Sequence, residues 1–458
     1  MSKIKVGIPQ GTRDFSAETV RKRSYIIQTI LEIFEIYGFQ PLETPAMENL
    51  ETLLGKYGEE GDKLIFKILN NGLNDPKNST RARKAFDNVM LGKNDADLTE
   101  RALRYDLTIP FARYVAMNHG QLSFPFRRYQ VQPVWRADRP QKGRYREFYQ
   151  CDADVVGSRS LINEVDLVSI YLEVFTKLRI ETEIKINSRN ILTALAEACS
   201  APDKLVGITT VIDKLDKTGL QKVREELQER GLGPHQIRII EQYLLIDGNN
   251  DQKLAKLKDL IGGNDSLSKG TREIEYLLSF FDHSANALTV DLTLARGLNY
   301  YTGVIFEAKA RNLQMGSIGG GGRYDDLTGL FGVPGIPGVG ISFGLDRIFD
   351  VMEELKLFPA AVLAGTRVLF FNLGETEARN SFSLMQALRS RGIASELYHE
   401  NAKFDKQFKY AERKNIPFAV IIGSKELSEG TCVIRNLVTG EQVTLEQTSL
   451  TEHDFGKQ

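Results

Sequence analysis

Arginine residues gather in one segment of this chain, and their spacing suits the binding of a polyanion. Seven cations and a single anion, Asp138, lie between residues 127 and 146, although the whole chain has a net charge of −1. A guanidinium group grips phosphate oxygens in pairs and does not lose its charge. We therefore expect a ligand such as the three phosphates of a nucleotide. The cations are Arg127, Arg128, Arg136, Arg139, Lys142, Arg144 and Arg146.

Aromatic side chains are interleaved with these cations and include the only tryptophan of the chain. A nucleotide base can stack on such a ring or on the plane of an arginine. The plain alternative is a solvated basic hairpin that only keeps the protein soluble. The rings favour a walled site over that alternative, and they are Tyr129, Trp135, Tyr145, Phe148 and Tyr149.

A glycine-rich run and a lone arginine are further candidates for a nucleotide site. The run GSIGGGGRYDDL, residues 316–327, has neither the dinucleotide-binding spacing nor the Lys-Ser/Thr pair of a P-loop. It is either a flexible loop or a strand whose backbone lets a flat ligand such as adenine come close. Arg347 follows a predicted strand at 339–343 and lies one turn into a helix, where it is either solvated or placed over a phosphate.

Two other segments carry residues suited to binding a small polar substrate. The segment LARGLNYYTG puts Arg296 beside Tyr300 and Tyr301 on a turn between two predicted strands, and a surface turn with packed rings is the alternative. Asp106 and Thr108 precede a predicted helix, where the plain role is that of a helix cap.

Composition excludes several classes of protein. With 458 residues, 42% hydrophobic and 26% charged, the chain is an ordinary globular protein of about three domains. Three scattered cysteines and five scattered histidines predict neither a disulfide framework nor a His- or Cys-built metal site or triad. We expect no metal ligands from the protein, and Mg²⁺ only as an ion carried with phosphates. No signal peptide or membrane span is predicted, so we expect a cytoplasmic protein.

Hydrophobic periodicity outlines the elements that position these residues. A helix is predicted from Ser16 to Gly38, followed by an extended segment. Residues 129–134 and 145–151 read as two strands of a hairpin whose loop contains 138–143. Residues 70–100 are predicted to form a surface loop with about one helical turn. Residues 190–284 show only helical spacing, strands return at 288–294 and 304–308, and strands alternate with helices after Pro359.

These segments together resemble one family over nearly the whole chain. RADRPQKGRYREFYQCD is similar to motif 2 of class II aminoacyl-tRNA synthetases, GISFGLDRI to motif 3, and the first helix with Pro45 in the strand after it to motif 1. LARGLNYYTG and SIGGGGRYDDL resemble the two segments peculiar to the histidyl-tRNA synthetase family, and GTRDF near the start and the last domain match as well. Asn299 stands where the family usually has Asp, which removes a charge beside the two tyrosines.

The resemblance implies an α/β fold: an α+β catalytic domain with an antiparallel sheet flanked by helices, a helical insertion and a C-terminal α/β anticodon-binding domain. The implied domains are 1–190 (catalytic core with motifs 1 and 2), 191–285 (helical insertion), 286–360 (catalytic core with the histidine-specific segments and motif 3) and 366–458 (anticodon-binding domain). It also implies a homodimer formed through motif 1.

The implied enzyme is a histidine--tRNA ligase that joins L-histidine to ATP as histidyl-adenylate and transfers histidine to the 3′ end of its tRNA. Arg136 and Arg296 match the catalytic arginines on the α-phosphate. ATP is the second substrate, and Mg²⁺ comes with its phosphates. The implied ATP-binding residues are Arg136, Arg144, Phe148 and Arg347, and the implied histidine-binding residues are Asp106, Thr108, Arg136, Gln150, Asp154, Arg296, Tyr300 and Tyr301.

Three alternatives share this fold. One is a catalytically inactive paralogue that serves as a regulatory subunit of histidine biosynthesis, which typically lacks the last domain and the active-site arginines. A tRNA-sensing domain belongs to a much longer kinase chain. A synthetase for glycine, threonine or proline would lack the segment with Arg296, Tyr300 and Tyr301.

Overall fold

The computed structural model describes residues 6–57, 61–281, 288–295, 300–359, 362 and 365–455, and only the main chain of residues 216 and 217. The chain forms two compact units, a larger one of residues 1–16 and 23–357 and a smaller one of residues 17–22 and 358–458. None of the helices in the described ranges is both long enough and apolar enough to cross a bilayer.

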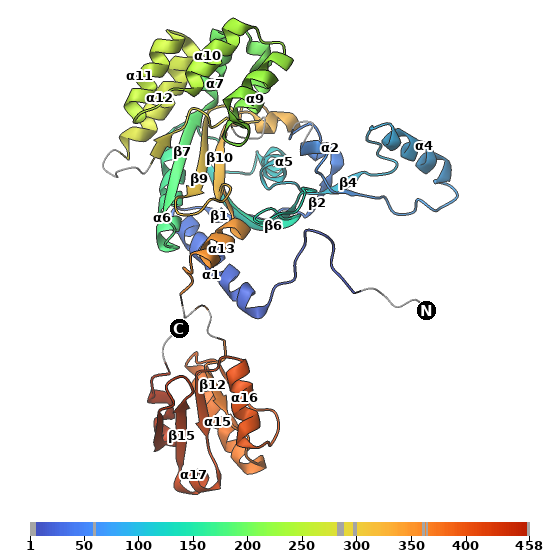
Figure 1. The fold of residues 1–458 in the computed structure, drawn as a ribbon. Helices are drawn as coiled ribbons and strands as arrows, with labels where there is room; N and C mark the ends of the chain where they lie inside the picture. Colours follow the sequence, from blue (N-terminus) through green and yellow to red (C-terminus); the bar gives the residue numbers. More distant parts are fainter. Residues whose placement is uncertain are drawn as a thin grey trace. The chain divides into compact units, whose positions relative to one another are not determined.

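An eight-stranded sheet is the centre of the larger unit (Figure 1). Neighbouring strands are antiparallel except in the outermost pairs, β1 with β5 and β7 with β8. This confirms the predicted antiparallel sheet. In sheet order the strands are β1 (Gln40–Pro41), β5 (Phe126–Trp135), β6 (Glu147–Val156), β11 (Gly338–Gly344), β10 (Gly319–Tyr324), β9 (Val304–Ala310), β7 (Thr182–Ser188) and β8 (Leu288–Val290).

Strands β5 and β6 form the hairpin that the sequence predicted. Their register pairs Arg128 with Asp154, Gln132 with Gln150 and Trp135 with Glu147. Successive side chains of a strand point to opposite faces, so Cys151 and Ala153, both buried, face one side while their even-numbered neighbours face the other. Residues 136–146 join the two strands, and we call them the arginine-rich loop.

Helices cover one face of this sheet. In α1 (Ala17–Ile36), buried Ile26, Ile30 and Phe34 recur at helical spacing, and the helix ends before Gly38 as predicted. Phe343 of β11 contacts both helices. The centre of its ring lies 5.9 Å from that of Phe34 in α1 and 5.4 Å from that of Phe175 in α6 (Ile162–Lys177). Since Phe343 faces these helices, its neighbour Ser342 faces the opposite side.

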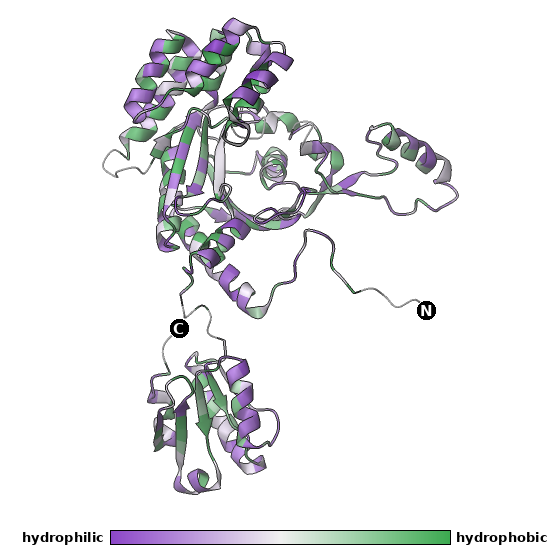
Figure 2. Ribbon diagram, in the orientation of Figure 1, coloured by the Kyte–Doolittle hydropathy of each residue, from purple (hydrophilic) through white to green (hydrophobic). Residues whose placement is uncertain are grey.

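The region predicted to be helical between the strands is helical in the structure (Figures 1 and 2). Its helices carry apolar stripes, visible in Figure 2 as green bands beside purple ones, and bury residues such as Leu195, Ile240 and Leu277. They are α7 (Arg189–Ala198), η1 (Pro202–Lys204), α8 (Leu205–Ile212), α9 (Leu215–Glu229), α10 (Pro234–Leu244), α11 (Asn250–Ile261) and α12 (Asp265–Ser279).

The prediction for residues 70–100 was wrong. Instead of a loop with one turn, this segment contains α4 (Ser79–Met90), a helix of 12 residues. Its polar composition hid a narrow apolar strip in which only Ala85 is buried. In the sequence, α4 lies between β3 (Lys67–Ile68) and β4 (Arg101–Leu103). These two strands and β2 (Met47–Asn49) form a small sheet of order β2-β4-β3. The short α2 (Leu50–Leu53) follows β2, and α5 (Thr108–Asn118) follows β4.

Strands alternate with helices in the smaller unit, as predicted. The buried β12 is parallel to both of its neighbours, β13 and β14, and the other pairs are antiparallel. The sheet order is β13 (Ser395–Leu397), β12 (Val368–Phe370), β14 (Phe418–Ile421), β15 (Thr431–Asn436) and β16 (Gln442–Glu446). The helices are α15 (Glu375–Ser390), α16 (Phe404–Arg413), α17 (Ser424–Glu429) and η3 (Gln447–Glu452).

Candidate active site

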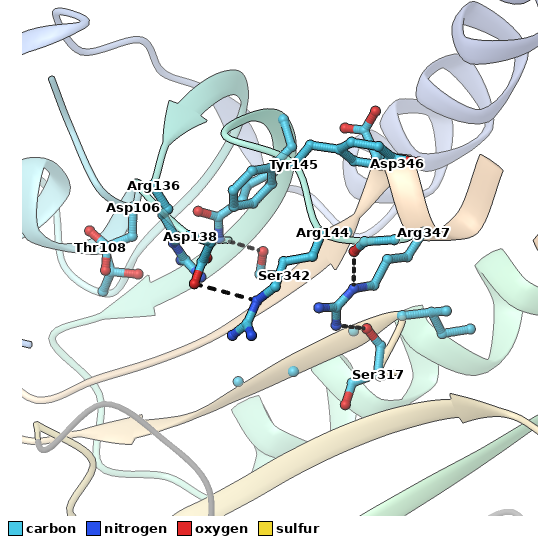
Figure 3. Close-up of a pocket in the computed structure, with 18 of the residues that line it drawn as sticks. Asp106, Thr108, Arg136, Asp138, Arg144, Tyr145, Ser317, Ser342, Asp346 and Arg347 are labelled. Atoms are coloured by element: carbon cyan, nitrogen blue, oxygen red, sulfur yellow. Dashed lines mark hydrogen bonds and ion pairs between the residues drawn. The ribbon is translucent and has the colours of Figure 1, made fainter. Parts of the chain in front are cut away.

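One cavity in the larger unit collects most of the residues that the sequence singled out (Figure 3). Its volume is about 350 Å³, and its walls come from β6, β10, β11, the arginine-rich loop and the first turns of α5 and α13 (Leu345–Glu354). Arg296 and Asn299 lie outside the described residues. The predicted site residues that line the cavity are Asp106, Thr108, Arg136, Arg144, Phe148, Gln150, Tyr300, Tyr301 and Arg347.

Asp106 is a buried carboxylate at the start of α5. Its Oδ1 accepts hydrogen bonds from the Tyr57 hydroxyl at 2.9 Å and the Ile109 N–H at 3.2 Å, and its Oδ2 accepts one from the Tyr300 hydroxyl at 3.4 Å. The bond from Ile109 is the helix-capping contact that the plain alternative predicted. Burial raises the pKa of Asp106, while the Ile109 N–H and nearby Arg136 act in the opposite direction. A cationic ligand would relieve this cost of burial.

Arg136 is held at the end of β5 between two aromatic rings. Its Nε donates to the Tyr105 carbonyl at 3.0 Å. The guanidinium carbon lies 4.3 Å from the centre of the Tyr105 ring and 5.2 Å from that of Phe148. Stacking fixes the plane of the group and leaves its terminal nitrogens for a ligand.

Arg144 and Arg347 reach the cavity from two different elements (Figure 3). Arg144, on the arginine-rich loop, has a half-exposed side chain whose Nε lies 3.4 Å from Asp138 Oδ1. Arg347, on the first turn of α13, donates from Nε to the Gly143 carbonyl at 2.8 Å and from Nη1 to the Ser317 carbonyl at 2.7 Å. The loop and the helix therefore present two cations to the same space.

Gln150 offers an oriented acceptor to the cavity. Its Nε2 donates to Ser342 Oγ at 2.9 Å, across the β6–β11 pair. Its Oε1 is buried, and none of the described groups donates a hydrogen bond to it. Because the amide nitrogen is already engaged, the oxygen is the atom left for a ligand that donates hydrogen bonds.

Asp154 lies further along the same face of β6 but does not line the cavity. Its Oδ2 is 2.9 Å from Nη2 of Arg128, and its Oδ1 accepts a hydrogen bond of 2.5 Å from the Tyr324 hydroxyl. Burial raises its pKa, and Arg128 acts against this rise. Arg128 is fully buried, and its Nε and Nη1 have no hydrogen-bond partner among the described groups.

Asp152, between Gln150 and Asp154, is another buried carboxyl on this face of β6. Burial raises its pKa from 3.8 to about 7; Arg128 opposes the shift and Asp154 adds to it. Three carboxyl groups, of Asp106, Asp152 and Asp154, are thus buried close together beside the buried cation Arg128, and we call this region the carboxyl-rich end of the site.

The glycine-rich run is the strand β10, so the flexible-loop alternative was wrong. A Cβ atom on Gly321 would lie 2.1 Å from the carbonyl oxygen of Gly340 on β11. Gly321 is therefore required by the close contact between the two strands. Three glycines of the run, Gly319, Gly320 and Gly321, also line the cavity.

Sequence reasoning missed several residues of the cavity. Ser342 could have been found from the strand alternation that opposes it to Phe343, and Asp346 from its position beside Arg347. Tyr145, one of the rings that the sequence predicted for a walled site, does line the cavity, whereas the missed residues are Asp138, Ser317, Ser342 and Asp346, with Phe306 on β9 as a further wall.

Comparison with known proteins bears on both units. Residues 79–348 match the family model described as Histidyl-tRNA synthetase, and residues 368–453 match the one described as Anticodon binding domain. A curated relative from Bacteroides fragilis (strain YCH46), named Histidine--tRNA ligase, is 52% identical over 451 residues, which are 97% of this chain and 98% of the relative.

Solved structures agree with this assignment. A histidyl-tRNA synthetase from Nostoc sp. PCC 7120 superposes with a TM-score of 0.81 at 31% identity, covering 98% of this chain and 99% of that one. An ATP phosphoribosyltransferase regulatory subunit/histidyl-tRNA synthetase from Bacillus halodurans has a TM-score of 0.68 at 19% identity, covering 88% and 96%, a likeness that concerns the fold alone. Because the family model matches more than half of the chain and the relative is 52% identical over nearly its full length, the chain belongs to the histidyl-tRNA synthetase family.

Proposed function

We propose that the cavity binds L-histidine and ATP side by side, and that the chain acts there as a histidine--tRNA ligase, the activity of its family. The observation that carries this assignment is the convergence of two chemically different groups of side chains on one space. The Asp106 carboxylate, the Gln150 amide and two tyrosines line one part, and arginines from the loop and from α13 line the other.

The first group suits the amino acid. The α-ammonium group of histidine would donate to the Asp106 carboxylate, to Thr108 and to Oε1 of Gln150, which accepts no hydrogen bond from the part of the chain that the structure describes. The imidazole ring, which has one donor and one acceptor, would be met by Tyr301 and Asp154. Asp154 would need to share its carboxylate between Arg128, Tyr324 and the ring.

The second group suits ATP. Arg136 would hold the α-phosphate, while Arg144 and Arg347 would hold the β- and γ-phosphates, and Phe148 would stack on adenine. These roles follow the family resemblance and agree with the three arginines and the ring lining one cavity. Arg296, which lies outside the described residues, is proposed on the resemblance alone as the second cation on the α-phosphate.

The reaction needs no protein nucleophile. The histidine carboxylate attacks the α-phosphorus in line, forming histidyl-adenylate and releasing pyrophosphate. A hydroxyl of the terminal adenosine of the tRNA then takes the histidyl group and releases AMP. Catalysis consists of positioning the two substrates and stabilising the charge on the phosphate. The smaller unit would bind the anticodon.

Mg²⁺ would come with the nucleotide and not as a resident metal. Among the described residues, no group of three or more His, Cys, Asp or Glu side chains is arranged to hold a metal ion. In the cavity, Asp346 is already bound by two arginines and Asp138 is paired with Arg144. Assembly as a homodimer through α1 and the strand after it is likewise proposed from the resemblance.

The decisive experiment measures ATP/pyrophosphate exchange in the presence of each of the 20 amino acids in turn. Charging of histidine tRNA is then measured with the amino acid that supports exchange. Exchange with histidine alone is the expected result. Exchange with another amino acid would point to a different synthetase, and no exchange at all would favour the inactive paralogue.

A further inference from the structure

The GTRDF segment near the start of the chain has no role in the site as described so far, yet Arg13 within it contacts two walls of the cavity from outside. The Arg13 guanidinium carbon lies 3.2 Å from the centre of the Tyr145 ring. Arg13 Nη2 also donates to Asp346 Oδ1 at the start of α13. Tyr145 and Asp346 line the cavity and Arg13 does not.

The main chain of the same segment is attached to the arginine-rich loop. The Arg146 N–H donates to the Gly11 carbonyl at 2.9 Å. Gly11 has a φ of +83°, and a Cβ there would lie 2.8 Å from Arg146 Cγ and 2.9 Å from Pro140 Cγ. Residues 11–13 are therefore packed closely against the loop, with Gly11 required by both its conformation and the available space.

Asp346 would stay paired without Arg13. Its Oδ1 also accepts from Nη1 of the buried Arg23 at 2.5 Å, and its Oδ2 accepts from the Tyr149 N–H at 3.0 Å. Removal of Arg13 thus leaves no unpaired buried carboxylate. What it removes is the connection between the ring of Tyr145 on the loop and the carboxylate of Asp346 on the helix.

The contacts of Arg13 with Tyr145 and Asp346 join the arginine-rich loop to α13, and the distance between these two elements matters for the binding of a triphosphate. Arg144 is on the loop and Arg347 is on α13, and the Arg347 Nε now bonds to the loop at Gly143. A phosphate that binds Arg347 through Nε competes with that bond. The separation of loop and helix must then be held by other contacts. The Tyr145 hydroxyl makes one by donating to Asp350 Oδ2 on α13 at 3.1 Å, and Arg13, which stacks on the Tyr145 ring, makes another.

We propose that Arg13 is a positioning residue for ATP: clamped between the Tyr145 ring and the Asp346 carboxylate, its guanidinium holds the arginine-rich loop at a set distance from α13, and so sets the spacing of Arg144 and Arg347. The proposal rests on the ATP site assigned above. It acts on the phosphate end of the cavity and leaves the histidine end unaffected.

The test compares variants in histidine-dependent exchange. Arg13→Ala raises the KM for ATP about tenfold or more, as displaced positioning groups do, while the KM for histidine and the melting temperature stay close to wild type. Arg13→Lys keeps the charge but not the planar stacked group, so its KM for ATP is intermediate. Asp14→Ala, an exposed position in the same segment, is the matched control and behaves as wild type.

A double-mutant cycle tests whether Arg13 acts through Tyr145. Arg13→Ala and Tyr145→Leu give less than the sum of their separate effects on the KM for ATP if one acts through the other. Gly11→Ala, which pushes the segment off the loop, raises the same KM and keeps the proposal testable should Arg13→Ala fold poorly. An unchanged KM for ATP in all these variants, or an equal rise in the KM for histidine, overturns it.

Calorimetric measurement of ATP binding in the absence of histidine tests the role of Arg13 independently of the proposed function. Weaker ATP binding by Arg13→Ala supports the positioning role whether or not exchange occurs. An ATP affinity equal to that of wild type in Arg13→Ala refutes that role even if the wild-type protein charges tRNA. Absence of exchange in the wild-type protein refutes the proposed function but not the positioning role of Arg13.

Discussion

Arg128 and Asp154 stand opposite each other in the β5–β6 register, and Arg128 Nη2 lies 2.9 Å from Asp154 Oδ2 in a fully buried ion pair. Asp154 belongs to the carboxyl-rich end of the site, and both members of the pair act on the neighbouring Asp152. The burial of the pair means that the loss of either partner strands a charge, which typically costs about 3–5 kcal/mol. Any variant of Asp154 therefore tests stability as well as recognition.

The first prediction separates these two effects at Asp154. Asp154→Ala should lower the free energy of unfolding and raise the KM for histidine, since it leaves Arg128 unpaired. The double variant Arg128→Met, Asp154→Leu should regain most of that stability, because both charges are gone, yet keep the high KM for histidine. Urea unfolding and exchange kinetics measure both. Recovery of histidine binding in the double variant would show that Asp154 has no part in recognition.

The second prediction concerns the free oxygen of Gln150. Gln150→Leu removes the acceptor from the cavity and should raise the KM for histidine about tenfold to a hundredfold, the usual cost of a buried donor left unpaired. The KM for ATP should change little. Ser342→Ala is the companion variant: it releases the Gln150 amide, which can then rotate, and should give a smaller rise of the same KM. Equal KM values for Gln150→Leu and wild type would contradict the assignment.

Arg144 provides the third prediction, with Lys142 as its matched control on the same loop. Arg144→Ala should raise the KM for ATP, because a charged hydrogen bond to phosphate is lost at the cavity wall. Lys142 does not line the cavity, and its ion pair with Glu354 of α13, at 2.5 Å, joins the loop to the helix only through an exposed contact of the kind that typically contributes little. Lys142→Ala should therefore match wild type in exchange kinetics. A similar rise in both variants would mean that only the net charge of the loop matters.

The fourth prediction is a pH dependence of stability that arises from Asp152. Its pKa is about 7 in the folded protein against 3.8 for an ordinary Asp. Between these values the unfolded chain loses this proton while the native state keeps it, so the free energy of unfolding falls as the pH rises. The slope from this group is at most about 1.4 kcal/mol per pH unit, and it vanishes above the folded pKa.

Asp152→Asn should lack this slope. Urea unfolding of both proteins at about pH 5, 6, 7 and 8 measures it, and wild type should lose stability relative to the variant up to about pH 7 and run parallel above it. Arg128, Asp154 and Asp106 are the charges around Asp152, and all are present in both proteins. Parallel curves over the whole range would show that Asp152 is ionised in the native state.

Arg296 gives the fifth prediction. Arg296→Ala should abolish histidine-dependent exchange while the far-UV circular dichroism spectrum and melting temperature remain those of wild type, since a cation on the α-phosphate is needed for the charge formed during attack. Exchange near the wild-type rate would remove Arg296 from the proposed mechanism.

Local patterns were enough to predict the elements whose causes are local. Alternation from residue 129 to 134 with Pro140 and Gly143 in the turn predicted the β5–β6 hairpin, and helical spacing predicted α1 and the helices from α7 to α12. The clustered arginines and the motif segments led from there to the family and to nine residues of the cavity. The same method failed for α4, because its composition is so polar that its apolar side is easily overlooked, and Ala85 is the one residue that the helix buries.

The sequence by itself determined the types of side chain that could bind a triphosphate and an amino acid, because charge and hydrogen-bonding capacity belong to the residues. Only the tertiary structure decided their partners. Arg13 meets Asp346 across 333 positions of the chain, and Asp154 is bound to Arg128 behind the cavity wall. Such pairs depend on strand register and on packing between distant elements, which no local preference encodes, and they decide which charges remain available to a substrate.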